Sequence, residues 1–282
     1  MPKNDKPTGI IDTITASWLN LIKNIRVYLN FTAVSVFLGL ALWLLKLVTQ
    51  DLATGRMASV AVTVAVSVPF TLAFMVLTLG LIIATWTGLG KKRPDFRESV
   101  VSGAKMLKSF VWLSVLTGLA FMAAPITVLI SSFTAAVMAA PILSQNPWLY
   151  VLAAGAMATL TGLVIAIPAY YALPLSFIAN HLSIDGIKGW SCLKRASGLV
   201  RGRWWRTLWR LSVPSLFFWL AVQLALKLVG ILTGMAFGDS ESVWYASLGL
   251  VISQSIYGLS YPLFVGTNLM VWNDLKRLEG RE

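Results

Sequence analysis

The stretch RGRWWRTLWRLSVPSLFFWLAVQLALKLVGIL, residues 201–232, joins a cationic, tryptophan-rich segment to a long apolar one. Residues 201–210 hold four arginines, three tryptophans and no acid, whereas residues 211–232 hold a single charged side chain, Lys227. About 20 mainly apolar residues are enough for a helix to cross the hydrocarbon core of a bilayer. The stretch therefore predicts a membrane-spanning helix that begins directly after a basic segment.

The rest of the chain has the composition of a membrane protein. Of its 282 residues 57% are hydrophobic and 12% are charged, and its mean hydropathy is +0.76. Soluble domains are usually about 25% charged. We therefore predict an all-α, polytopic integral membrane protein that forms a single membrane domain over residues 1–282. Its six spans are expected at approximately residues 31–48, 57–87, 110–138, 148–178, 211–232 and 244–271.

Basic residues are concentrated in every second one of the segments that flank these spans. Residues 1–30, 88–109, 179–210 and 272–282 hold 20 of the 23 lysines and arginines, and the other side holds Lys46, Arg56 and Lys227. Lysine and arginine are retained on the cytoplasmic side of a membrane. The N- and C-termini of this multi-pass protein are therefore both expected in the cytoplasm.

Three of the basic segments contain a pattern typical of an amphipathic helix. These helices are expected at residues 10–25, 94–110 and 183–200, and each precedes a pair of spans. In the first helix the apolar residues at helical spacing are Ile11, Ile14, Trp18, Leu21 and Ile22. We expect the three helices to lie in the cytoplasmic interface, although packing on the spans as a collar is an alternative.

The order of helix, span and span occurs three times, which favours a threefold structural repeat. The alternative is that any two-span hairpin needs a basic lead-in, without a true repeat. In the third unit, Ser183 is expected to cap the helix and Asp185 suits its first turn.

The arginines before the fifth span predict a site for anionic lipid headgroups. On a helix Arg203, Arg206 and Arg210 share one face, and no acid lies nearby in the sequence to pair with them. Like charges four residues apart repel, so an external anion such as a lipid phosphate would satisfy them, with Arg210 reaching outward. Tryptophans prefer the same depth. The predicted site comprises Arg201, Arg203, Trp204, Trp205, Arg206, Trp209 and Arg210; the alternative is orientation and anchoring only.

Other classes of site are poorly supported. The chain has one histidine, His181, and one cysteine, Cys192, which is too few for a His-rich metal site or a disulfide. It contains no HExxH, no GxSxG and no carboxylate pair within a span. We therefore expect no metal, no cofactor, no catalytic residues and no enzyme activity. Nucleic acid is not an expected partner, because the basic residues follow membrane sidedness and lie in short loops.

Prolines that interrupt the fourth and sixth spans favour an alternative function. Broken spans sometimes line transport pathways. A transporter of a small or lipid-like solute would use Pro168, Tyr170, Tyr171, Pro174 and Pro262 as its candidate pathway residues.

Two segments resemble a known family. LKRASGLVRGRWWRTLWRLSVPSLFFWL, residues 193–220, and YPLFVGTNLMVWNDLKRLEG, residues 261–280, resemble the membrane domain of glycerophosphoryl diester phosphodiesterases and the related YciC-like six-span proteins. The tyrosine-rich exit usual in that family is replaced here by Val271, Trp272 and Asn273. The resemblance implies a bacterial cytoplasmic (inner) membrane protein. It implies no phosphodiesterase activity, since that needs a separate soluble domain with metal-binding carboxylates and paired histidines.

Together these observations predict a non-enzymatic protein that interacts with phospholipids or supports envelope homeostasis. Membrane phospholipids with anionic headgroups are the expected partners. Self-association and a membrane-protein partner are both left open.

Overall fold

The computed structural model describes residues 8–50, 56–118, 172–237 and 243–279, together with residues 148, 151, 155–156, 159 and 170. In these ranges the regular structure is α-helical and there are no strands. The helices are α1 (Ile10–Lys23), α2 (Ile25–Gln50), α3 (Arg56–Leu89), an unlabelled helix over Phe96–Gly118, α6 (Ile178–Ile184), α7 (Trp190–Val200), α8 (Trp204–Phe237) and α9 (Val243–Glu279).

Five described helices are long and apolar enough to cross a membrane, which is typical of an integral membrane protein. Their apolar portions are Ile25–Thr49, Ala61–Leu89, Phe96–Gly118, Trp204–Gly234 and Ser247–Glu279. Most of the predicted 148–178 span and residues 119–138 of the predicted third span lie outside the described residues. The count of six spans and the threefold repeat therefore stay predictions.

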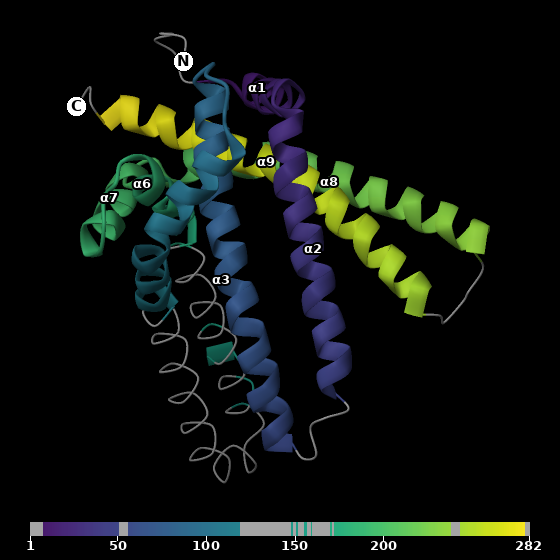
Figure 1. Cartoon of the computed structure of the whole chain (residues 1–282). Helices are drawn as coiled ribbons and strands as arrows, with labels where there is room; N and C mark the ends of the chain where they lie inside the picture. Colours follow the sequence, from purple (N-terminus) through teal and green to yellow (C-terminus); the bar gives the residue numbers. More distant parts are fainter. Residues whose placement is uncertain are drawn as a thin grey trace.

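Four of the described spans, α2 with α3 and α8 with α9, form two helical hairpins that meet at one end of the molecule (Figure 1). Helices α2 and α3 pack side by side, as do α8 and α9, and α9 also packs against α1, α2 and α3. Both the α6–α7 segment and α1 contact α9 near its C-terminal end, where Trp272 meets His181 and Asp274 meets Thr8. The described basic residues of α1, of the α6–α7 segment and of the end of α9 are thus gathered at one end of the hairpins.

The first predicted interfacial segment is a separate helix. Helix α1 ends at Lys23, and the non-helical residue Asn24 separates it from α2. At this corner the Asn24 amide nitrogen donates to the Asn20 backbone oxygen at 3.1 Å and to Asn20 Oδ1 at 2.8 Å. Because the side chain satisfies groups at the helix end, the chain can turn from α1 into α2.

The second segment differs from its prediction, because residues 96–118 form one continuous helix rather than an interfacial helix at 94–110 and a distinct span. Asp95 starts it by accepting the Glu98 backbone N–H at 2.8 Å. Its Gly103 lies so close to α3 that an added Cβ would approach Val76 O to 2.7 Å. This backbone contact packs the helix directly onto α3.

The third segment is two helices rather than the single one predicted over 183–200. Residues 185–189 separate α6 from α7, and Gly186 and Gly189 have φ angles of +68° and +63°. Such angles favour glycine and end a helix. Ser183 is therefore buried in the last turn of α6 instead of capping a helix, and Asp185 is at the C-terminal cap of α6 instead of in a first turn. In the sequence, Gly186 and Gly189 next to Asp185 were the signal for this break.

Candidate functional site

The start of α8 presents an outward-facing surface of tryptophan and arginine. Trp205 and Trp209 lie one turn apart, and 70% and 64% of their surfaces are exposed. The same face continues along the helix with exposed Leu216, Leu220 and Ile231. Arg206 is also exposed. The two indoles are therefore the first members of an apolar stripe of largely exposed residues that runs along the span.

Arg201 and Arg203 belong to the turn that connects α7 to α8. Gly202 between them has a φ of +74°, a backbone angle that favours glycine. Arg201 is exposed and Arg203 is partly buried. The Arg203 backbone oxygen accepts the Thr207 hydroxyl at 2.9 Å. Thr207, which is buried, thus links the first turn of α8 to the turn that precedes it.

Trp204 has a different environment from Trp205 and Trp209. Its indole N–H donates to the Tyr170 backbone oxygen at 2.9 Å, and its ring stacks on that of Tyr170 with centroids 5.7 Å apart. The contact joins two residues that the sequence assigned to different sites, the predicted headgroup site and the predicted pathway. Trp204 therefore anchors the segment before α6 to the start of α8.

Arg210 is turned into the protein, contrary to the expectation that it reaches outward. Its guanidinium forms an ion pair with Asp274 and also donates to the Thr8 backbone oxygen at 2.9 Å. Only 12% of the Arg210 side chain and 5% of the Asp274 side chain are exposed. An acid 64 residues away along the chain thus satisfies this arginine, so it does not need a lipid phosphate.

A buried polar cluster joins α6 to the C-terminal part of α9. His181 Nδ1 lies 2.9 Å from Asp185 Oδ2, Trp272 Nε1 donates to His181 Nε2 at 3.2 Å, and Lys276 Nζ donates to Asp185 Oδ1 at 2.6 Å. Lys276 also lies 4.6 Å from the centre of the Trp272 ring. Because Nε2 accepts the indole proton, the imidazole is neutral with its own proton on Nδ1, directed to Asp185.

The pKa values of His181 and Asp185 are both shifted, and both residues lie outside the apolar spans. Burial lowers the pKa of His181 from 6.5, and this effect outweighs the opposing influence of Asp185. Burial on its own would raise the pKa of Asp185, but hydrogen bonds from Lys276 and His181 lower it below 3.8. The folded state thus favours neutral His181 beside a charged Asp185. From the sequence, His181 was considered too isolated to form a His-rich metal site, and Asp185 four residues later was the signal for its partner.

Helix α1 has its polar side facing the protein and its apolar side facing outward. Thr13, Ser17 and Asn20 are buried. The Asn20 amide donates to the Tyr28 hydroxyl at 2.9 Å. An added Cβ at Gly266 of α9 would lie 2.9 Å from Ser17 Oγ, so these helices are in close contact. The exposed residues on the opposite side are Ile11, Trp18, Leu19 and Ile22. This arrangement is the reverse of a helix that packs on a soluble core.

Helix α7 has the usual arrangement of an amphipathic helix, with its apolar side buried against the protein and its charged side exposed. Cys192, Ala196 and Leu199 are buried, whereas Lys194 and Arg195 are exposed. The Cys192 thiol lies 3.4 Å from the Ile178 backbone oxygen, and burial raises its pKa to about 11. Cys192 is therefore a protonated, structural thiol. Within the described residues no three His, Cys, Asp or Glu side chains are grouped so that they could hold a metal ion.

The predicted pathway residues do not come together in the described part of the chain. Pro168 and Tyr171 lie outside the described residues. Pro174 is buried before α6, Tyr170 stacks on Trp204, and Pro262 is buried within α9.

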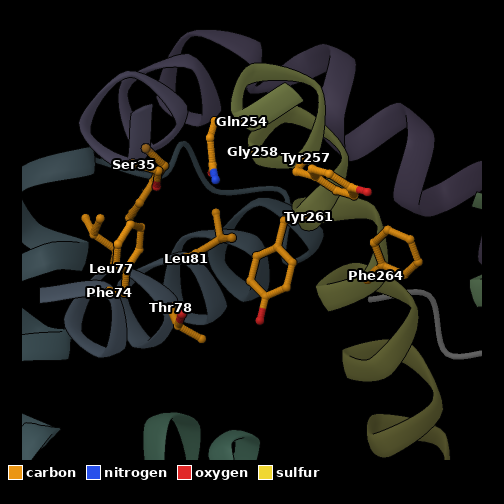
Figure 2. Close-up of a pocket in the computed structure, with 11 residues that line it drawn as sticks. Ser35, Phe74, Leu77, Thr78, Leu81, Gln254, Tyr257, Gly258, Tyr261 and Phe264 are labelled. Carbon is orange, nitrogen blue, oxygen red and sulfur yellow. The ribbon is translucent and has the colours of Figure 1, made fainter. Parts of the chain in front are cut away.

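A pocket of about 260 Å³ lies elsewhere, between α2, α3 and α9 (Figure 2). Its lining residues come from three separated segments, so no local motif could have indicated it. They are Phe31, Ser35, Phe74, Leu77, Thr78, Leu81, Gln254, Tyr257, Gly258, Tyr261 and Phe264.

Compared with protein-family models, curated proteins and solved structures, the chain shows no significant match to any of them. A function is therefore inferred from the geometry of the chain itself.

Proposed function

We propose that this integral membrane protein binds anionic phospholipid headgroups at the start of α8, through Arg201, Arg206, Trp205 and Trp209, and has no catalytic activity of its own. The observation that carries the proposal is the position of the two exposed tryptophans at the end of the outward-facing apolar stripe of α8. If acyl chains cover that stripe, the indoles lie at the headgroup level that they prefer. Arg206, within the same turn, is then placed beside lipid phosphates.

The outward-facing apolar side of α1 supports a second contact with the same leaflet. Ile11, Trp18 and Ile22 are exposed at the end of the molecule where the basic segments gather. An apolar helix side of this kind is stabilised when it lies in the boundary between headgroups and acyl chains. We infer that α1 rests in this boundary, while its polar side is held by α2 and α9.

The proposed location follows from charge and from the family resemblance. The basic segments gather at one end of the hairpins, so the rule that places lysine and arginine in the cytoplasm acts on all of them in the same direction. The resemblance of residues 193–220 and 261–280 to the glycerophosphodiesterase membrane domain and YciC-like proteins supports a bacterial cytoplasmic membrane. A role in envelope homeostasis rests on this resemblance alone.

Lipid retention tests the headgroup site. The protein is purified in nanodiscs of mixed anionic and zwitterionic lipid, and the bound lipids are counted by native mass spectrometry after gentle release. Each surface-proximal basic residue contributes about 1 kcal/mol with anionic lipid. The variant Arg201→Gln/Arg206→Gln is therefore expected to lose about 2 kcal/mol, or roughly thirty-fold in affinity for the anionic lipid.

The matched control is Arg26→Gln/Arg97→Gln, which removes two exposed arginines and so changes the net charge equally. A site at α8 predicts a clearly larger loss in the first variant than in the control. Equal losses of lipid affinity in the two variants would indicate a general attraction between cationic residues and anionic lipid, without a specific site. No loss of affinity in either variant would rule out the headgroup site.

A further inference from the structure

The pocket between α2, α3 and α9 lies within apolar spans. Its lining residues fall in Ile25–Thr49, Ala61–Leu89 and Ser247–Glu279. Tyr257 and Tyr261 at its wall are 47% and 43% exposed. The pocket is therefore open at the side of the helices, and a molecule that enters it comes from the hydrocarbon region of a bilayer.

The lining has no charged side chain. A phosphate or carboxylate would be left uncompensated there, at high cost in a low dielectric. Five of the eleven lining residues are aromatic, namely Phe31, Phe74, Tyr257, Tyr261 and Phe264. Aromatic walls favour a flat, unsaturated ring that can pack in offset or edge-to-face geometry. The volume of about 260 Å³ is just below the usual range of small-molecule pockets, roughly 300–1,000 Å³, and suits one ring rather than a two-chain phospholipid.

Polar groups lie at two opposite ends of this mainly apolar pocket. Gln254 extends from α9 into the pocket, beside Gly39 of α2, whose missing side chain leaves room for it. Its amide makes no hydrogen bond to any residue in the described part of the chain. Figure 2 shows the Gln254 amide nitrogen at one end, and the Tyr261 hydroxyl with Thr78 at the other. The Tyr257 hydroxyl accepts the Gln223 amide of α8 at 3.5 Å, which leaves its own proton free to donate.

An amide without a partner in a span costs free energy, because neither water nor lipid tails can hydrogen-bond to it there. A bound oxygen acceptor would remove that cost. Donors at opposite ends of an aromatic pocket match a ring that carries carbonyl oxygens on opposite sides. We propose that this pocket binds a neutral, lipid-soluble ring compound of the quinone type, with one carbonyl oxygen on the Gln254 amide and the other near Tyr261 and Thr78. The proposal concerns binding only, and it does not depend on the headgroup site at α8.

Equilibrium binding of a quinone with a ten-carbon tail to the full-length protein in detergent micelles tests this proposal. The comparison ligand is a benzene with the same tail and no carbonyl groups. We expect saturable binding of the quinone and weaker binding of the benzene. The variants Gln254→Leu and Thr78→Val each remove one hydrogen-bonding group and are expected to weaken quinone binding roughly five- to tenfold, with little effect on the benzene.

The matched control is Asn30→Leu, which removes an exposed amide of α2 that does not line the pocket. It should leave quinone affinity unchanged. Thermal unfolding and gel-filtration profiles of each variant show whether it is folded, and Thr78→Val provides a milder change where Gln254→Leu unfolds the protein. Equal affinity for quinone and benzene, or unchanged quinone affinity in both pocket variants, would overturn the proposal. So would saturable binding of straight-chain acyl compounds only, which would indicate an acyl-chain pocket.

Discussion

Arg210, in the second turn of α8, forms an ion pair with Asp274 near the end of α9, and both side chains are largely buried. The same carboxylate accepts the Thr8 backbone N–H at 2.8 Å, and Arg210 donates to the Thr8 backbone oxygen. One charge pair thus joins the start of one span, the end of another and the residues that lead into α1. The pair therefore stabilises the contacts between these three segments, at the end of the molecule where the basic segments meet.

The first prediction concerns this pair. Replacing Asp274 by Asn leaves the Arg210 guanidinium buried without a counter-charge, and breaking a buried pair on one side typically costs about 3–5 kcal/mol. We expect Asp274→Asn to lower the free energy of unfolding by an amount of this order and to lower the Tm, as measured by thermal unfolding in detergent.

Two further variants identify the cause. Arg206→Gln removes an exposed arginine one turn before Arg210 and should change stability by less than about 0.5 kcal/mol. The double variant Arg210→Met/Asp274→Leu removes both charges and should be more stable than Asp274→Asn alone. If Arg206→Gln were as destabilising as Asp274→Asn, the ion pair would have no special role.

The Arg210–Asp274 contact also shows where sequence reasoning stops. Four of the five described apolar helices overlap predicted spans over most of their length, because span length and composition are local properties, whereas the helix over 96–118 begins where an interfacial helix was expected. The partner of Arg210 could not be predicted, because it lies 64 residues away in another helix. Without that partner, the arginine was assigned to a lipid phosphate.

Helix breaks were predictable only in part. The corner at Asn24 follows an amphipathic pattern that changes into a uniformly apolar run, whereas the helix over 96–118 passes through the same kind of change without a break. What differs is packing, since Gly80 and Gly103 allow that helix to approach α3 closely around residues 99–103, within the segment where the change occurs. The α2–α3–α9 pocket also depends on contacts between distant segments, so no periodicity in the chain could indicate it.

The second prediction uses glycines at helix contacts. A Cβ on Gly88 would lie 2.3 Å from Asn20 Oδ1 and 2.8 Å from Asn24 Nδ2, both of which belong to the α1–α2 corner. Gly88→Ala is therefore expected to be destabilising by about 1–3 kcal/mol, the range for overpacking, in a thermal unfolding measurement. Gly230→Ala is the control, because an added Cβ there meets nothing within 4 Å and alanine favours a helix. Equal stability of both variants would show that the corner does not pack on α3.

The third prediction concerns the orientation of α1 at the membrane. Since Cys192 is buried, a Cys192→Ala background allows single spin labels at Ile11, Trp18 or Ser17. In nanodiscs, labels at Ile11 and Trp18 should be more accessible to oxygen, which concentrates in lipid, than to a water-soluble nickel reagent. A label at Ser17, which faces Gly266 of α9, should be shielded from both. Preferential access of the nickel reagent to Ile11 and Trp18 would place this side of α1 in water.

The fourth prediction follows from the depressed pKa of His181. Because the folded pKa lies below the unfolded value of 6.5, the unfolded state binds more protons between those two values. Stability is therefore expected to be complete above pH 6.5 and to decrease as the pH falls from 6.5 towards the folded pKa. Asp185, whose pKa is also lowered, adds a second decrease as the pH falls below 3.8. The Tm in detergent, measured in steps between pH 8 and pH 3, would reveal both.

His181 is the only histidine in the chain, so the decrease that begins near pH 6.5 can be assigned to it. His181→Gln retains a hydrogen-bonding amide but cannot titrate, and it should flatten the Tm profile between pH 8 and pH 5 even if its Tm is lower throughout. Lys276→Gln retains the histidine, so it should keep a decrease in this range. A wild-type profile that is flat between pH 7 and pH 5 would mean that His181 accepts a proton as easily in the folded protein as in the unfolded one, in contradiction to its full burial between Asp185 and Trp272.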